Sequence, residues 1–148
     1  MMTKIVQRPF DGHEKTACRV LIVEDQLLIA LDLESLVDGS SAGVRVVGMA
    51  SDLDYAMSFM GKTDIAFVDI NLADGPTGPE IGRRLADAGV TVIFMTGNPE
   101  QLGDGVAGTL GVLTKPVSAE SVQQALDFAV AKRERRLAVV PRLMRSFA

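Results

Sequence analysis

Hydrophobic and polar residues alternate along this chain in blocks of two kinds. Five short runs are rich in apolar and β-branched residues, which is the pattern of buried strands. Longer segments between these runs repeat apolar residues at intervals of three or four, which is typical of helices with one buried face. The predicted strands cover residues 19–23, 44–49, 65–68, 90–95 and 110–113.

Five helices are predicted, one after each strand, and several of their ends carry a capping signal. Serine or aspartate at a helix start accepts hydrogen bonds from the first turn, and glycine just past the end favours an exit from the helix. The fourth helix is the weakest prediction because glycines interrupt its apolar spacing. The helices are expected between Asp25 and Gly39, near 52–60 with Ser51 or Asp52 as cap, near 78–88 and 99–105, and from Ser118 towards Arg136.

This alternation of strands and helices predicts an α/β fold whose parallel sheet is covered by helices on both faces. Right-handed crossovers favour a flavodoxin-like, doubly wound sheet with five strands in the order 2-1-3-4-5. On this pattern the chain divides into an N-terminal extension (1–17), one domain (18–136) and a basic, apolar C-terminal tail (137–148).

The composition agrees with one folded domain whose core is mainly aliphatic. The chain has 148 residues, of which 47% are hydrophobic, but it contains only six Phe, one Tyr and no Trp. The formal charge of -4 is uneven, because residues 132–148 carry +5 and the remainder therefore carries -9. Such an acidic body argues against direct binding of nucleic acid.

Other features of the sequence narrow the setting in which the protein works. A single cysteine, Cys18, excludes an intramolecular disulfide and a cysteine-rich metal site. No apolar run approaches the ~18 residues that span a bilayer, and the first residues lack the pattern of a signal peptide. We therefore expect a cytoplasmic protein with no membrane partner.

Chemically capable side chains follow four of the five predicted strands. Glu24 and Asp25 follow the first strand, Asp69 the third, Thr96 the fourth and Lys115 the fifth. Open parallel sheets bind ligands at the carboxyl ends of their strands, near the point where the strand order reverses. Strands one and three are neighbours in the predicted order, so three carboxylates would meet there, and a hard cation such as Mg²⁺ would offset their repulsion. Each acid alone could simply cap a helix or end a strand, and it is the whole set that favours a binding site.

Together these positions resemble the characteristic set of the response-regulator receiver family. The resemblance extends over about residues 19–136 and rests on the acidic pair at 24–25, on Asp69 and Thr96, and on the Lys-Pro dipeptide at 115–116. The spacing from the second acid of the pair to the aspartate is 44 residues, from the aspartate to the threonine 27, and from the threonine to the lysine 19, all familiar in receivers.

The resemblance implies a phosphorylation site and a metal site. Asp69 would accept a phosphoryl group from a phosphohistidine on a sensor histidine kinase or a histidine phosphotransfer protein. Mg²⁺ would be held by Glu24, Asp25, Asp69 and the backbone carbonyl of Asn71, and it would neutralise the transferring phosphoryl oxygens.

The resemblance also implies roles for residues that contact the phosphoryl group. Lys115 would pair with one phosphoryl oxygen and Thr96 would donate its hydroxyl to another, while the bond before Pro116 would be cis. Many receivers have an aromatic switch residue three positions before the lysine, but Val112 stands there, so the usual coupling of the threonine to an aromatic rotamer cannot operate. We expect instead that the glycine-rich loop 97–108 is mobile and is ordered by phosphorylation, the alternative being an ordinary surface loop.

Short stretches of the sequence resemble particular subgroups of receivers. Phe-x-Thr-Gly at 94–97 is similar to a subgroup of stand-alone receivers, and Thr-x-x-Pro-Glu at 96–100 resembles general-stress regulators of alphaproteobacterial type. Residues 24–33 resemble receivers whose kinases are of the HWE or a related class.

Features outside the predicted site bear on partners. His13 is the only histidine and is expected at the surface, so the phosphodonor histidine must come from another protein. The tail is either a solvated helix end or a segment for docking or homodimer formation. We favour the second interpretation because the tail's apolar residues have no evident core to enter. These residues are Leu137, Val139, Val140, Leu143, Met144 and Phe147.

The resemblance implies a signalling protein rather than an enzyme, with Mg²⁺-dependent self-phosphorylation and autodephosphorylation as its only chemistry. Because twelve residues follow Arg136, we expect output through phosphorylation-dependent partner binding or phosphorelay, with the downstream partner unknown. One alternative is a phosphate sink that drains a kinase, and another is a degenerate receiver that binds without phosphate. A Mg²⁺-dependent aspartyl-phosphate phosphohydrolase would need an acid two residues beyond the nucleophile, where Asn71 stands.

Overall fold

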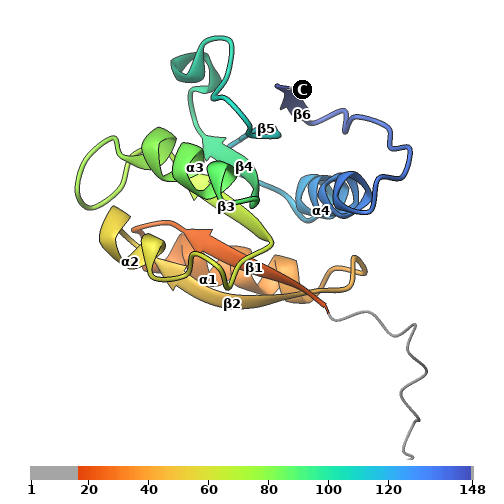
Figure 1. Ribbon diagram of the computed structural model, residues 1–148, viewed down its shortest axis with the longest axis horizontal. Coiled ribbons are helices and arrows are strands. Elements are labelled where there is room, and N and C mark those ends of the chain that lie inside the picture. Colours follow the sequence, from red (N-terminus) through yellow and green to blue (C-terminus); the bar gives the residue numbers. More distant parts are fainter. Residues whose placement is uncertain (1–16, 148) are drawn as a thin grey trace, which may run out of the picture.

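The computed structural model describes residues 17–147, which form one six-stranded sheet with helices on both sides (Figure 1). The first five strands are parallel and lie in the order 2-1-3-4-5, so the predicted flavodoxin-like arrangement is confirmed. A sixth, antiparallel strand extends the sheet beyond the fifth. The strands are β1 (Cys18–Val23), β2 (Val44–Ala50), β3 (Ile65–Asp69), β4 (Thr91–Thr96), β5 (Gly111–Thr114) and β6 (Met144–Ser146).

Four α-helices and one 3-10 turn connect these strands within the described residues. The prediction of five α-helices was wrong at the fourth, which is the single turn η1. Gly103 and Gly105 follow that turn with φ of 53° and 117°, a backbone conformation that ends a helix. The last helix also stops before the predicted limit at 136, and Arg135 has a φ of 57°. The helices are α1 (Leu27–Asp38), α2 (Leu53–Met57), α3 (Gly78–Asp87), η1 (Pro99–Leu102) and α4 (Ala119–Arg133).

The capping residues expected from the sequence hold the helix starts in the structure. Asp52 Oδ1 accepts a hydrogen bond from the Tyr55 N–H at 2.9 Å, which caps α2. The Ser118 hydroxyl accepts from the Ser121 N–H at 3.0 Å, and the Ser121 hydroxyl accepts in turn from the Ser118 N–H at 2.9 Å. This reciprocal pair satisfies two backbone donors at the start of α4 and fixes where that helix begins.

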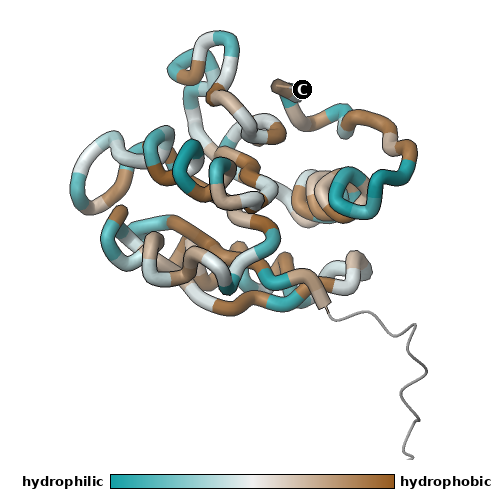
Figure 2. Tube along the Cα trace, in the orientation of Figure 1, coloured by the Kyte–Doolittle hydropathy of each residue, from teal (hydrophilic) through white to brown (hydrophobic). Residues whose placement is uncertain are grey.

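The sheet has a hydrophobic core on each face because successive strand residues point to opposite sides. In β1, Val20 and Ile22 pack with α1 and α4, whereas Leu21 and Val23 pack with α2 and α3. The central strands follow the same alternation and are apolar on both faces. Figure 2 shows the hydrophobic residues of these strands along the middle of the molecule. Burial on both faces explains why these strands read as continuous apolar runs in the sequence.

The C-terminal tail joins the domain instead of leaving it. Met144 is buried in the core, and Phe147 packs against the cluster on the opposite face of the sheet. The expectation that the tail's apolar residues have no core to enter was therefore wrong for these two. Leu137 and Val139 are exposed, on the stretch that leads to β6. We call residues 141–147, which carry β6, the strap.

His13 and nearly all of the predicted N-terminal extension lie outside the described residues. Among residues 17–147, no helix combines the length and the apolar composition that a membrane crossing requires.

Candidate functional site

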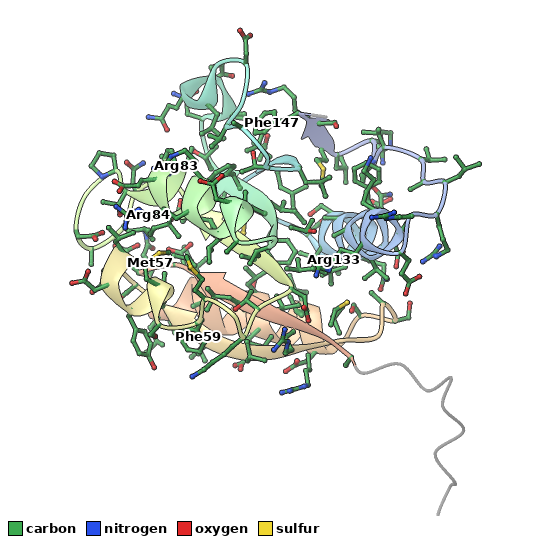
Figure 3. All side chains as sticks on the ribbon, viewed as in Figure 1. Met57, Phe59, Arg83, Arg84, Arg133 and Phe147 are labelled. Carbon is green, nitrogen blue, oxygen red and sulfur yellow. The ribbon has the colours of Figure 1, made fainter. Side chains whose placement is uncertain are left out.

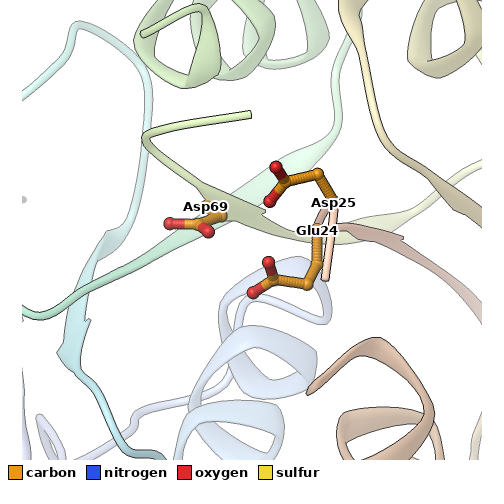
Figure 4. Close-up of side chains that lie close together, drawn as sticks. All are labelled: Glu24, Asp25 and Asp69. Atoms are coloured by element: carbon orange, nitrogen blue, oxygen red, sulfur yellow. The ribbon is translucent and has the colours of Figure 1, made fainter. Parts of the chain in front are cut away.

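Three carboxylates meet at the carboxyl ends of two neighbouring strands. Glu24 and Asp25 follow β1, and Asp69 is the last residue of β3, which lies beside β1. One carboxylate oxygen from each residue lies within 4.8 Å of the other two. Figure 4 shows the three side chains facing the same space above the strand ends. The sequence prediction that these acids converge is borne out by this geometry.

The ammonium group of Lys115 bridges the two buried carboxylates of this cluster. Lys115 Nζ donates to Glu24 Oε1 at 2.7 Å and to Asp69 Oδ2 at 3.0 Å. The lysine follows β5 directly, and its backbone N–H donates to the Thr96 carbonyl at 2.8 Å. The peptide bond between Lys115 and Pro116 is cis, as predicted. The turn at the end of β5 thus aims a cation across the strand ends into the acidic cluster.

Asp69 lies close to the start of α3. Its Oδ1 accepts a hydrogen bond from the Ile70 N–H at 2.8 Å, which orients the carboxylate. The Gly78 N–H, at the first turn of α3, donates to the Ile70 carbonyl at 2.9 Å. A Cβ on Gly78 would lie 2.1 Å from the Asp69 carbonyl oxygen, so only glycine permits this approach. Nothing in the sequence indicated a functional role for Gly78, which was expected only as a helix start.

Thr96 ends β4 and is buried beside the cluster. Its hydroxyl oxygen accepts a hydrogen bond from the Asn98 N–H at 3.1 Å, so it is tied to the loop that follows. Asn71 is exposed in the segment after β3. Its role as a carbonyl ligand, like the roles of the other site residues, stays a prediction.

Burial and proximity shape the charges in the cluster. Burial raises the pKa of the Glu24 carboxyl, because its charged form loses hydration at a position that is 3% exposed. Hydrogen bonds from Lys115 and from the Gln26 N–H oppose this rise without cancelling it. Burial also lowers the pKa of the Lys115 ammonium, but its hydrogen bonds to Glu24 and Asp69 outweigh burial and leave that pKa raised. The site therefore favours a charged lysine.

The donor set fits a hard divalent cation. Two unit charges within 4.8 Å repel by roughly 3 kcal/mol at an effective dielectric constant of 20, and Lys115 offsets only one of the three negative charges. Carboxylate oxygens are the ligands that Mg²⁺ prefers in proteins. Glu24, Asp25 and Asp69 together can therefore hold Mg²⁺, with an exposed side at Asp25 through which an ion and a phosphodonor could enter.

Position 112, where many receivers have an aromatic switch residue, is occupied by a valine. Val112 is 2% exposed in β5, with the core cluster formed by α2 and α3. Its register partners in the sheet are Phe94 of β4 and Arg145 of β6, and the second of these was not expected from the sequence. The signal that could have found this contact was weak, because β6 has only three residues.

Comparison with known proteins gives a match over most of the chain. The family model described as "Response regulator receiver domain" matches residues 20–127. The phyllosphere-induced regulator PhyR of Methylorubrum extorquens is 35% identical over 128 residues, which are 80% of this chain and 47% of that protein. The chain thus spans about half the length of the curated relative it matches.

Solved structures agree with this match. The receiver domain of Erythrobacter litoralis PhyR superposes with a TM-score of 0.69 at 32% identity, covering 83% of this chain and 97% of that chain. The anti-anti-sigma factor PhyR from Bartonella quintana superposes with a TM-score of 0.61 at 28% identity, covering 88% of this chain and 54% of that chain.

Proposed function

The chain belongs to the response regulator receiver domain family, and on that premise we propose that it accepts a phosphoryl group on Asp69 and signals through its phosphorylated form. The observation that carries this proposal is the cluster of Glu24, Asp25 and Asp69 with Lys115 bonded across it. Repulsion between neighbouring carboxylates lowers the stability of a fold. A domain that contains such a cluster together with a lysine directed into it has the groups needed to bind Mg²⁺ and a phosphoryl group.

The proposed reaction moves one phosphoryl group between two proteins. A carboxylate oxygen of Asp69 attacks the phosphorus of a phosphohistidine, forming an O–P bond as the P–N bond breaks. The electron pair of that bond stays on the imidazole nitrogen of the donor. Asp69 is suited to this step because its two oxygens are already held, one by the Ile70 N–H and the other by Lys115.

Lys115 and Thr96 would then stabilise the product. The Lys115 ammonium lies 3.0 Å from Asp69 Oδ2, so it can move to a phosphoryl oxygen without a large change of position. The Thr96 hydroxyl can donate its proton to a second phosphoryl oxygen. Mg²⁺, held by Glu24, Asp25, Asp69 and the Asn71 carbonyl, would neutralise charge on the phosphoryl oxygens.

Partners follow from the chemistry of the phosphodonor. A receiver implies a histidine kinase as partner, here proposed as a sensor kinase of the HWE class or a histidine phosphotransfer protein. All three of the matched proteins described above are forms of PhyR, one of them named an anti-anti-sigma factor, which supports a role in sigma-factor signalling. We place this exchange in the cytoplasm, where receivers generally work.

Phosphorylated Asp69 could serve either in a regulator or relay, or in a phosphate sink, and the lifetime of the phosphoryl group distinguishes these two functions. If Asp69 phosphate persists and can return to the donor histidine, the chain is a regulator or relay. If it hydrolyses rapidly without passing on, the chain is a phosphate sink. A phosphohydrolase is disfavoured because Asn71, and not an acid, stands two residues beyond Asp69.

The test is incorporation of a phosphoryl group from acetyl phosphate in the presence of Mg²⁺, followed by intact mass. The wild-type chain should gain one phosphoryl group, and Asp69→Ala should gain none. Asp87→Ala is the matched control, because Asp87 is an exposed aspartate on α3 that pairs only with Arg83 among the contacts of the described residues. Labelling of Asp69→Ala, or no labelling of any variant, would contradict the proposal.

A further inference from the structure

The strap lies along the open edge of the sheet, beside the strand that carries the usual switch position. β6 runs antiparallel to β5, and Arg145 is in register with Val112. The Phe147 N–H donates to the Leu110 carbonyl at 3.0 Å, which extends the pairing past the end of the strand. Met144 is 6% exposed and anchors the strap in the core shared with α4.

Arg145 ties the strap to the loop that follows β4. Its Nη2 donates to the Pro99 carbonyl at 2.7 Å and its Nη1 donates to the Gly103 carbonyl at 2.9 Å. Pro99 begins η1 and Gly103 follows its last residue, so one guanidinium group holds both ends of the turn. The planar guanidinium of arginine presents its N–H donors in a fixed fork, so one side chain can bind both carbonyls at once.

Phe147 makes a second attachment to the same loop. A Cβ on Gly105 would lie 2.7 Å from Phe147 Cγ, so the ring lies directly against the backbone there. The Arg145 guanidinium carbon is 5.0 Å from the centre of that ring, which joins the two attachments. Figure 3 shows Phe147 between β6 and the loop after β4.

The loop held by the strap starts at the residue that would sense the phosphoryl group. Thr96 accepts the Asn98 N–H at 3.1 Å, and Asn98 immediately precedes Pro99, the first carbonyl bound by Arg145. A Thr96 hydroxyl drawn towards a phosphoryl group on Asp69 would therefore pull on the segment that Arg145 holds. Only three residue steps, each with three backbone bonds, separate Thr96 from Pro99, so the two ends of this short segment cannot move far independently.

We infer that the strap is the element that responds to phosphorylation: it holds the loop 97–105 in the unphosphorylated form and is released from β5 when Asp69 is phosphorylated. This inference rests on the proposed function of Asp69 and adds the route by which the signal leaves the site. Val112 carries no ring that could swing between the site and the surface. The backbone carbonyls of η1 pass the movement to Arg145 instead, and release uncovers the edge of β5.

Such a coupling must act in both directions, because linkage between two equilibria is reciprocal. If phosphorylation loosens the strap, then a loosened strap must favour the phosphorylated form. Two independent measurements on the full chain therefore test the same inference, one at the strap and one at the site.

The first measurement is amide hydrogen exchange with Mg²⁺, with and without beryllofluoride as the phosphoryl mimic. The Phe147 amide should exchange at least about fivefold faster with the mimic, the lower end of common coupling energies. Asp69→Ala should show no change. If amides near Thr96 and Lys115 respond while Phe147 keeps its protection, the inference is overturned and the proposed function stands. If neither region responds, both are overturned.

The second measurement is the affinity for beryllofluoride in two arginine variants. Arg145→Ala removes the contacts to Pro99 and Gly103 and should bind the mimic at least about fivefold more tightly than the wild type. Arg142→Ala is the matched control, since it loses the same charge from the same segment and its guanidinium lies 3.7 Å from Glu120 on an exposed face. Equal affinities for the two variants would overturn the inference.

Discussion

Replacing Lys115 with methionine tests whether the bridge across the acidic cluster stabilises the fold before any phosphoryl group arrives. Methionine keeps most of the length and apolar volume of the lysine side chain but removes its charge. The change leaves Glu24 and Asp69 without the ammonium that lies 2.7 and 3.0 Å from their oxygens. In buffer without Mg²⁺, we expect Lys115→Met to unfold more easily than the wild type.

The expected magnitude follows from burial and contact. A hydrogen bond to a charged group contributes roughly 1.5–3 kcal/mol, and removing one partner of a buried ion pair costs about 3–5 kcal/mol. The Lys115 side chain is 20% exposed, so water screens part of the interaction and the lower end applies. We expect a loss of about 3 kcal/mol, which for a chain of this size lowers Tm by roughly 6–12 °C.

Urea unfolding followed by circular dichroism measures this loss, with Lys62→Met as the control because Lys62 is exposed. That control should change the free energy of unfolding by less than about 0.5 kcal/mol. Saturating Mg²⁺ should stabilise Lys115→Met more than the wild type, since the cation offsets the repulsion that the lysine otherwise offsets. A Lys115→Met variant as stable as the wild type without Mg²⁺ would show that desolvation of the ammonium cancels the bridge.

Three further predictions test the surroundings of the site and the base of the sheet. Gly78→Ala places a Cβ 2.1 Å from the Asp69 carbonyl oxygen, so it should lower the free energy of unfolding by about 2 kcal/mol or more and slow phosphorylation. In the control Gly97→Ala the added Cβ meets nothing within 4 Å, so the free energy of unfolding, measured with urea, should change by less than about 1 kcal/mol. Asp25→Asn should weaken Mg²⁺ binding about tenfold or more by isothermal titration, and an unchanged affinity would remove Asp25 from the proposed ligands. A hydrogen bond from Arg19 lowers the pKa of the Asp64 carboxyl below its usual 3.8, so the stability it adds is present above about pH 4 and is lost as pH falls through the lower folded-state pKa. Asp64→Asn should therefore be less stable than the wild type at pH 6 and approach it in acid, and a difference that grows in acid would contradict this sign.

The central part of the fold could be predicted because its signals are local and agree with each other. The buried strands read as unbroken apolar runs, and helix ends at Asp52, Ser118 and Gly89 carry residues whose side-chain or backbone preferences act within one turn. Strand order then followed from the handedness of the crossovers and needed no knowledge of side-chain contacts.

Elements that depend on distant contacts could not be predicted in the same way. η1 has weak helical spacing, and Arg145 binds the carbonyls of Pro99 and Gly103, at the two ends of this turn, from 46 and 42 residues away. β6 has three residues, too few for a period-two pattern, and it exists because β5 offers an open edge. The tail was expected to dock on another protein or a second copy of the chain, but residues 144–146 of the tail pair with β5 of the same chain.

In the candidate site, the positions of the charged residues could be predicted from the sequence, but several of their contacts could not. Spacing and strand ends brought Glu24, Asp25 and Asp69 together correctly, since strand topology alone fixes which ends are neighbours. The hydrogen bond from Lys115 to Glu24 Oε1 was not foreseen, because the family resemblance implied only a phosphoryl oxygen as a partner of the lysine. The close approach of Gly78 to Asp69 was equally hidden, since a missing Cβ leaves no chemical signal in a sequence.

The valine at the usual switch position and the added strand are two parts of one arrangement. An aromatic switch needs a pocket beside β5 that its ring can enter and leave, and such a pocket must stay open at the edge of the sheet. In this chain the strap occupies that edge, with Arg145 opposite Val112 and Phe147 against Gly105. A large ring at position 112 would have to fit into a core where the valine is already 2% exposed. The covered edge and the burial of Val112 leave no free space for a ring at this position, which agrees with the inference that the strap and not residue 112 responds to phosphorylation.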